Sequence, residues 1–66
     1  MQIRLNGRPH EVGDDTTVDA LLLSVTGSSR GSAAVVDGEV VPRSAWPTTA
    51  LKDGQSVELI TAVQGG

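Results

Sequence analysis

VELITAV, residues 57–63, is the stretch of sequence that decides the fold we predict. Its side chains alternate between two faces of a strand, with Val57, Leu59 and Thr61 on one face and Glu58, Ile60 and Ala62 on the other. The run is apolar enough for a strand in the middle of a sheet. A strand in that position needs a neighbour on each side, and the rest of the chain supplies two hairpins.

The first neighbour is a hairpin close to the N-terminus. Ile3 and Leu5 alternate with polar residues, and Asn6-Gly7 then supplies the positive φ angles of a tight turn. Residues 8–12 return as the second strand. Pro9 has no backbone N–H to donate, so we expect this second strand to lie at an edge of the sheet.

The second neighbour is AAVVDGEVV, residues 33–41, in which Asp37-Gly38 forms the turn between two β-branched runs. Pro42 ends the second strand of this hairpin. The segment that follows crosses over to the last strand with one or two short turns. Trp46 and Leu51 are the residues that we expect to anchor this crossing segment in the core.

DDTTVDALLLSVTG, residues 14–27, predicts the one helix. Apolar residues at i, i+3, i+4 and i+7 form a single stripe, which consists of Val18, Leu21, Leu22 and Val25. Thr16 opens a capping-box pattern and Thr17 is a rival N-cap, while Gly27 is a natural stop. Leu23 points off the stripe, either to the periphery of the core or toward a partner.

Two hairpins, one helix and a final strand predict an α+β domain of two layers, in which the sheet covers the helix on one face. With the last strand in the middle, this is the β-grasp plan of ubiquitin, a mixed sheet of four to five strands packed on one α-helix. No linker or repeat divides the 66 residues, so residues 1–66 form a single domain. A chain of this length buries only about 60% of its unfolded surface, so its core is small.

The composition excludes several classes of function. The net charge is −3, the five basic residues are scattered and only one residue is aromatic, whereas nucleic-acid binding needs a basic stripe and often stacking platforms. No apolar run has the length of a membrane span, and the N-terminus lacks the layout of a signal peptide. We therefore expect a soluble cytoplasmic protein, monomeric when free, that binds neither nucleic acid nor membrane.

No set of side chains predicts catalysis or a metal site. There is no cysteine, and His10 is the only histidine, so we interpret it as a surface residue. GSSRGS, residues 27–32, lacks the lysine of a phosphate-binding loop and follows a helix instead of opening one, so it is a connecting loop. Asp14 and Asp15 precede the helix, where negative charge is favourable. We expect that the protein is no enzyme.

The chain ends in Gln64-Gly65-Gly66, shortly after the predicted strand. Glycine has no Cβ, so such a tail enters a narrow channel and adopts backbone angles closed to other residues. Three extended residues reach roughly 10 Å, which is enough to place a terminal carboxylate in the active site of a partner. The Gly66 carboxylate is a poor electrophile that becomes reactive as an acyl-adenylate, and without a nucleotide-binding motif in this chain another protein must activate it.

We expect a docking surface beside this tail. If Leu59 faces the helix, then Ile60 and Ala62 lie on the open face of the sheet and lead toward the tail. Exposed apolar surface of this kind often marks a docking site. The alternative is that residues 43–52 cover this face. Arg43 is a third candidate for contact with a partner.

The whole chain resembles the ThiS family, the small ubiquitin-like sulfur carriers of bacterial thiamine biosynthesis. The matching pieces are the Met-Gln-Ile start, TVDALL at 17–22, VVPRSAW at 40–46, DGQSVELI at 53–60 and the terminal Gly-Gly. The most specific of them are Val41-Pro42-Arg43 and Trp46. The small subunit of molybdopterin synthase shares the fold and the diglycine, but is usually longer and differs before its last strand.

The resemblance implies acyl chemistry on Gly66. An adenylating enzyme of the ubiquitin-activating type (ThiF family) would use ATP to form an acyl-adenylate there. Sulfur from the persulfide of a cysteine desulfurase would replace AMP and leave a thiocarboxylate, and a thiazole synthase of the ThiG family would take that sulfur. ATP and the persulfide are then used by the partners, so the resemblance implies no bound cofactor and a protein that acts as a cosubstrate.

Other functions fit the same residues. A sulfur carrier for molybdopterin or for another sulfur-containing metabolite would use the same terminus and a different acceptor. A ubiquitin-like modifier would join Gly66 to lysines of target proteins. A plain binding module would tolerate removal of Gly65-Gly66, whereas a sulfur carrier would not.

Overall fold

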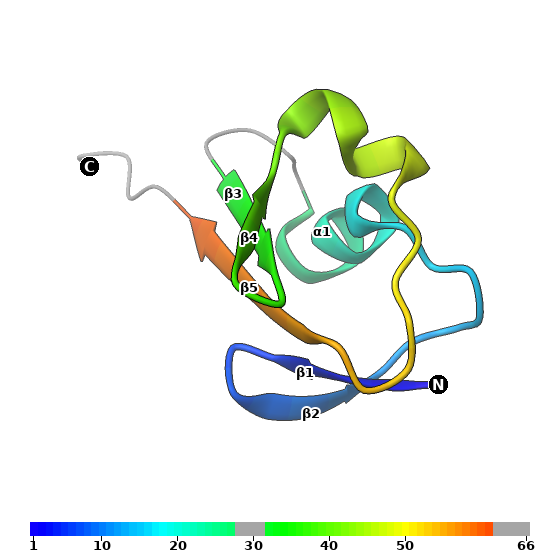
Figure 1. Cartoon of the computed structure of the whole chain (residues 1–66). Coiled ribbons are helices and arrows are strands. Elements are labelled where there is room, and N and C mark those ends of the chain that lie inside the picture. The colour runs from blue at the N-terminus through cyan, green and yellow to red at the C-terminus, as the bar shows by residue number, and fades with distance from the viewer. Residues whose placement is uncertain (28–31, 62–66) are drawn as a thin grey trace.

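A computed structural model describes residues 1–27 and 32–61 of the chain. Its elements are β1 (Gln2–Leu5), β2 (Arg8–Glu11), α1 (Val18–Thr26), β3 (Ser32–Val36), β4 (Glu39–Val41), the 3-10 helix η1 (Arg43–Thr48) and β5 (Ser56–Thr61). The strands form one sheet in the order β2-β1-β5-β3-β4, and α1 lies against one face of it (Figure 1). The last strand is therefore in the middle of the sheet, as predicted.

β5 joins the two hairpins into one sheet. It runs parallel to β1, with Leu5 opposite Val57, and antiparallel to β3, with Ala34 opposite Leu59. β2 and β4 form the edges, so Pro9 lies on an edge strand as expected. The mixed five-stranded sheet and its single helix confirm the predicted α+β, β-grasp fold.

Both hairpins turn on the predicted dipeptides. Asn6 and Gly7 have φ angles of 51° and 82°, and Asp37 and Gly38 have φ angles of 49° and 84°. Positive φ at both central residues defines a type I′ turn, whose twist matches that of the flanking strands. Asn, Asp and Gly adopt these angles more readily than other residues, so the two dipeptides fix where each hairpin folds back.

α1 begins and ends at capping residues. Oγ1 of Thr17 accepts a hydrogen bond from the backbone N–H of Ala20 at 3.1 Å, which makes Thr17 the N-cap. The hydroxyl of Thr16 instead donates to the carbonyl oxygen of Gly13 at 2.6 Å, so the capping box predicted at Thr16 is wrong and its rival Thr17 is the cap. Gly27 ends the helix in the left-handed conformation, with φ 75°, as predicted.

The core lies between α1 and the sheet. Its buried hydrophobic residues are Ile3, Val18, Leu21, Leu22, Ala34, Trp46, Leu51, Val57 and Leu59. The indole N–H of Trp46 donates to the carbonyl oxygen of Val41 at 2.9 Å, so the polar atom of this buried side chain has a partner. Trp46 and Leu51 anchor the crossing segment in the core, as predicted.

The second half of α1 is less buried than its sequence pattern indicates. The apolar stripe places Val25 in the core, but the side chain is 46% exposed, so this part of the prediction is wrong. The buried residues Val18, Leu21 and Leu22 lie in the first half of the helix. Leu23, which points off the stripe, is 47% exposed. The helix thus continues for a turn beyond the core that it covers.

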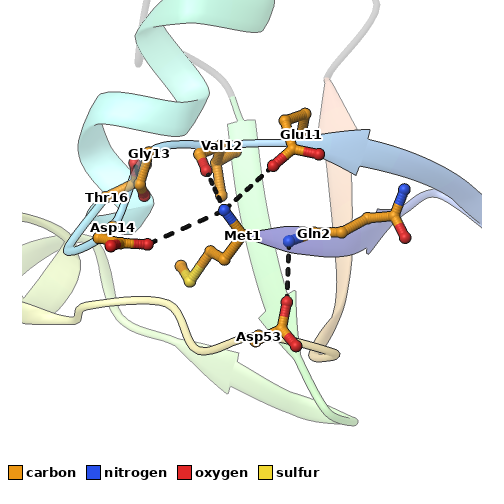
Figure 2. A network of polar contacts seen from close by, with 8 residues as sticks. All are labelled: Met1, Gln2, Glu11, Val12, Gly13, Asp14, Thr16 and Asp53. Atoms are coloured by element: carbon orange, nitrogen blue, oxygen red, sulfur yellow. Dashed lines mark hydrogen bonds and ion pairs between the residues drawn. The ribbon is translucent and has the colours of Figure 1, made fainter.

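The N-terminal ammonium is part of a polar network at the start of β1 (Figure 2). It donates to the carbonyl oxygen of Val12 at 2.9 Å and lies 3.0 Å from a carboxylate oxygen of Glu11 and 3.9 Å from one of Asp14. The hydrogen bond to Glu11 raises the pKa of the Met1 ammonium above its ordinary value of 8.0, burial opposes this, and the charges of Glu11, Asp14 and Asp53 add to the increase.

Candidate functional site

The face of the sheet opposite α1 is the candidate docking surface. Along β5, Val57 and Leu59 are buried, whereas Glu58 and Ile60 point away from the core. Because Leu59 faces the helix, Ile60 lies on the open face, as predicted. Its side chain is 56% exposed.

Four apolar side chains gather on this open face. The strand register places Ile60 opposite Ala33, and Val35 opposite Val40. Side chains opposite each other on antiparallel strands have Cβ atoms about 5 Å apart, so they are in contact. Val40 is 71% exposed, whereas Ala33 and Val35 are half-buried. We refer to these four residues as the open-face patch.

Charged side chains border the open-face patch. Glu58 lies opposite Val35 on the neighbouring strand, and Arg4 of β1 lies opposite Ser56 of β5. Both charged residues are exposed. An apolar centre with a polar rim is the usual arrangement of a surface that binds another protein.

The crossing segment does not cover the open-face patch, so the alternative interpretation of residues 43–52 is wrong. η1 packs against α1, on the other side of the sheet. After η1, the carbonyl oxygen of Thr49 accepts from the N–H of Val18 at 3.0 Å, and the N–H of Leu51 donates to the carbonyl oxygen of Thr16 at 2.8 Å. These bonds tie the segment to the start of the helix.

Arg43 lies on η1 and not on a strand of the open-face patch. It is the first residue of η1, and the carbon of its guanidinium lies 5.9 Å from the centroid of the Trp46 ring, within the range of a cation–π contact. The structure thus gives Arg43 a contact with the buried Trp46. A contact between Arg43 and a partner stays a prediction.

The other predicted site residues follow β5. Ala62, Gln64, Gly65 and Gly66 all lie outside the described residues. The structure does describe the strand that precedes them in the sequence. This is the central strand of the sheet, which ends at Thr61, one residue beyond Ile60 of the open-face patch.

The sequence does not predict one polar contact of β5, which it makes with the side chain of Asn6. The backbone N–H of Leu59 donates to Oδ1 of Asn6 at 2.9 Å, and Nδ2 of Asn6 donates to the carbonyl oxygen of Leu59 at 3.4 Å. The Asn-Gly dipeptide is a signal for a turn. It carries no signal that the side chain binds a strand 53 residues further along.

The described residues provide no metal site. His10 lies on the edge strand β2 and is half-buried. Within residues 1–27 and 32–61, no group of three or more His, Cys, Asp or Glu side chains is placed to hold a metal ion. None of the helices in this part of the chain is long and apolar enough to cross a membrane.

The fold and the open-face patch define a class of protein: a small ubiquitin-like β-grasp domain with one apolar face of its sheet exposed. Residues 3–66 match the ThiS family. The chain belongs to this family, which confirms the resemblance seen in its sequence.

Known relatives resemble the chain over its whole length. The crystal structure of the thiamine biosynthesis protein ThiS from Geobacter metallireducens is similar with a TM-score of 0.84 and 30% identity, over 100% of both chains. The sulfur carrier protein ThiS of Escherichia coli strain K12 is 29% identical over 66 residues, which is 100% of both. A thiazole synthase of Paramagnetospirillum magneticum is 32% identical over 66 residues, and the chain spans only 20% of the length of that relative.

Proposed function

We propose that this protein carries sulfur for thiamine biosynthesis as a thiocarboxylate on Gly66. The observation that carries the proposal is the similarity, over the full length of both chains, to the sulfur carrier protein ThiS of Escherichia coli. The similarity of the whole chain to a fifth of a thiazole synthase supports an enzyme of that type, the ThiG family, as the acceptor of the sulfur.

The first step activates the carboxylate of Gly66. One of its oxygens attacks the α-phosphorus of ATP, pyrophosphate leaves, and an acyl-adenylate forms. The step is needed because a carboxylate with a pKa of about 3.5 is ionised at pH 7 and resists attack by nucleophiles. The sequence contains no phosphate-binding motif, so an adenylating enzyme of the ThiF family binds the ATP.

The second step introduces sulfur. The terminal sulfur of a cysteine desulfurase persulfide attacks the carbonyl carbon of the acyl-adenylate, AMP leaves, and an acyl-persulfide forms. A second thiol then attacks the S–S bond, which releases the thiocarboxylate and leaves the two thiol sulfurs joined as a disulfide. The protein has no cysteine of its own, so its side chains cannot hold sulfur as a thiol or persulfide.

The open-face patch is the surface through which we propose that these enzymes bind. Ile60 of the patch precedes the last described residue of β5, so an enzyme bound there lies beside the start of the tail. The protein is then a cosubstrate that its partners grip and modify. Because their chemistry uses ATP and thiols, we place the exchange in the cytoplasm.

Intact mass tests this proposal. The chain is incubated with ATP, a ThiF-family enzyme, a cysteine desulfurase, cysteine and a thiol reductant. We expect one oxygen to be replaced by one sulfur in the full chain, and no replacement in a variant that lacks Gly66. The variant should keep the melting temperature of the wild type, since no residue of the described core lies beyond Leu59. An unchanged mass of the full chain, with enzymes that modify their own carrier, would refute the proposal.

A further inference from the structure

Asn6 is a turn residue whose side chain binds the central strand. Its backbone N–H donates to the carbonyl oxygen of Val57 at 2.8 Å. Its carboxamide then accepts from the N–H of Leu59 at 2.9 Å and donates to the carbonyl oxygen of Leu59 at 3.4 Å. A single residue thus holds β5 at two successive points along the same side of the strand.

The carboxamide continues the pairing where β1 stops. β1 pairs with β5 at two positions, Arg4 opposite Ser56 and Leu5 opposite Val57. The chain then turns away at Asn6, whereas β5 continues to Thr61. A primary amide offers the same acceptor and donor as a peptide group. The Asn6 side chain therefore extends the pairing on this side of β5 as far as Leu59.

The second hairpin holds the opposite end of β5 in a comparable way. Asp37 is the first central residue of the other type I′ turn, with a φ of 49° against 51° for Asn6. Its Oδ1 accepts from the N–H of Ser56 at 3.0 Å, and its own N–H donates to the carbonyl oxygen of Ser56 at 2.8 Å. Asp37 thus holds the beginning of β5, and Asn6 holds its second half, close to the last described residue of the strand.

We propose that Asn6 is a positioning residue for the acyl chemistry of the tail. This inference rests on the proposed function. Ile60, the residue on β5 that we propose for docking, lies directly between Leu59 and Thr61, so the bonds to Leu59 fix the patch relative to the last described residue of the strand. A partner that binds the patch then meets the end of the described strand, which precedes the tail in the sequence, at a defined position. Acyl transfer is sensitive to such geometry, since a misplacement of about 1 Å can cost about 100-fold in rate.

Three variants separate positioning from stability. Asn6→Gly removes both side-chain hydrogen bonds and keeps the turn, because glycine adopts positive φ freely. Asn6→Asp keeps the acceptor for the N–H of Leu59. Asp37→Gly is the matched control, since it deletes two side-chain bonds from the same turn position at the far end of β5, those from the N–H of Ser56 and from Nε2 of Gln55.

Two measurements are made on each full-length variant. Amide hydrogen exchange at Leu59 and Ser56 reports the bonds themselves. ATP–pyrophosphate exchange by a ThiF-family enzyme, with the chain as varied substrate, gives kcat and KM. We expect Asn6→Gly to speed exchange at Leu59 and to lower kcat about tenfold or more at unchanged KM. Asp37→Gly should speed exchange only at Ser56 and keep kcat, and Asn6→Asp should keep Leu59 protected and retain most of kcat.

Other outcomes overturn the inference. A kcat of Asn6→Gly equal to that of the wild type would show that the bonds to Leu59 do not affect the tail. Equal losses in Asn6→Gly and Asp37→Gly would assign both effects to stability, and a change in KM alone would assign Asn6 to docking. If the wild type supports no pyrophosphate exchange, the proposed function fails and this inference fails with it, whereas an active wild type tests the inference alone.

Discussion

Replacement of Ile60 by alanine tests whether the open-face patch binds the adenylating enzyme. Ile60 is 56% exposed in the free protein. Complete burial of such a side chain is worth about 1.5–3 kcal/mol, so covering the exposed fraction on docking contributes about 0.8–1.7 kcal/mol. Alanine keeps the Cβ and so retains part of this contribution, and we expect Ile60→Ala to weaken binding by at most roughly 4- to 17-fold.

Leu23→Ala is the matched control for this prediction. Leu23 is 47% exposed, close to the value for Ile60, but it lies on α1 and not on the open face. Both variants are titrated with a ThiF-family enzyme by calorimetry, and only Ile60→Ala should lose affinity. An unchanged affinity of Ile60→Ala, or an equal loss in Leu23→Ala, would refute docking through the open-face patch.

Three further predictions concern stability. Trp46→Phe removes the donor of a 2.9 Å hydrogen bond, so the free energy of unfolding in urea should fall by about 1–3 kcal/mol, and a wild-type value would contradict this. In the same assay, Val18→Ala at a fully buried site should lower the free energy of unfolding by about 2 kcal/mol, and Val25→Ala by less than about 0.5 kcal/mol. Equal losses in the two variants would show that α1 packs along its whole length. The raised pKa of the Met1 ammonium stabilises the fold below pH 8.0, and this stabilisation is lost as pH rises through the folded pKa. The melting temperature of the 66-residue chain should therefore fall as the pH rises above 8.0, less so in Glu11→Gln, and a melting temperature independent of pH there would contradict the prediction.

Local chemistry made the hairpins predictable. Asn6-Gly7 and Asp37-Gly38 require no knowledge of the rest of the fold, because few other dipeptides tolerate two positive φ angles. The central place of β5 was predictable for a related reason. Its apolar side chains need to be buried, and two hairpins that lack a common partner strand leave the position between them for β5.

How far the core extends along α1 was harder to predict from the sequence. Val25 has the same helical period as Val18, but periodicity shows which side chains share a face and not where the opposing surface ends. The choice of N-cap had a similar difficulty. Thr16 and Thr17 both carry a suitable hydroxyl, and the choice depends on the carbonyl of Gly13, which engages the hydroxyl of Thr16.

The candidate site was predictable only along one strand. Alternation with Leu59 places Ile60 on the open face, because both residues belong to β5. The addition of Val35 and Val40 to the patch depends on the register between strands, which the sequence does not show. The hydrogen bond between Asn6 and Leu59 was unpredictable for the same reason, since it joins residues that only the folded sheet brings together.

The place of β5 in the sheet also determines when the protein is able to fold. β5 is the last of these strands to be synthesised, yet β1 and β3 pair with it and not with each other. Before Ser56–Thr61 leaves the ribosome, the nascent chain holds two separate hairpins, which are marginal in water on their own. The pairing of Leu5 with Val57 then joins residues that are far apart in the sequence, and contacts of this kind form slowly during folding. The sheet therefore cannot be completed before β5 is available, and until then the nascent chain exposes unpaired apolar strands.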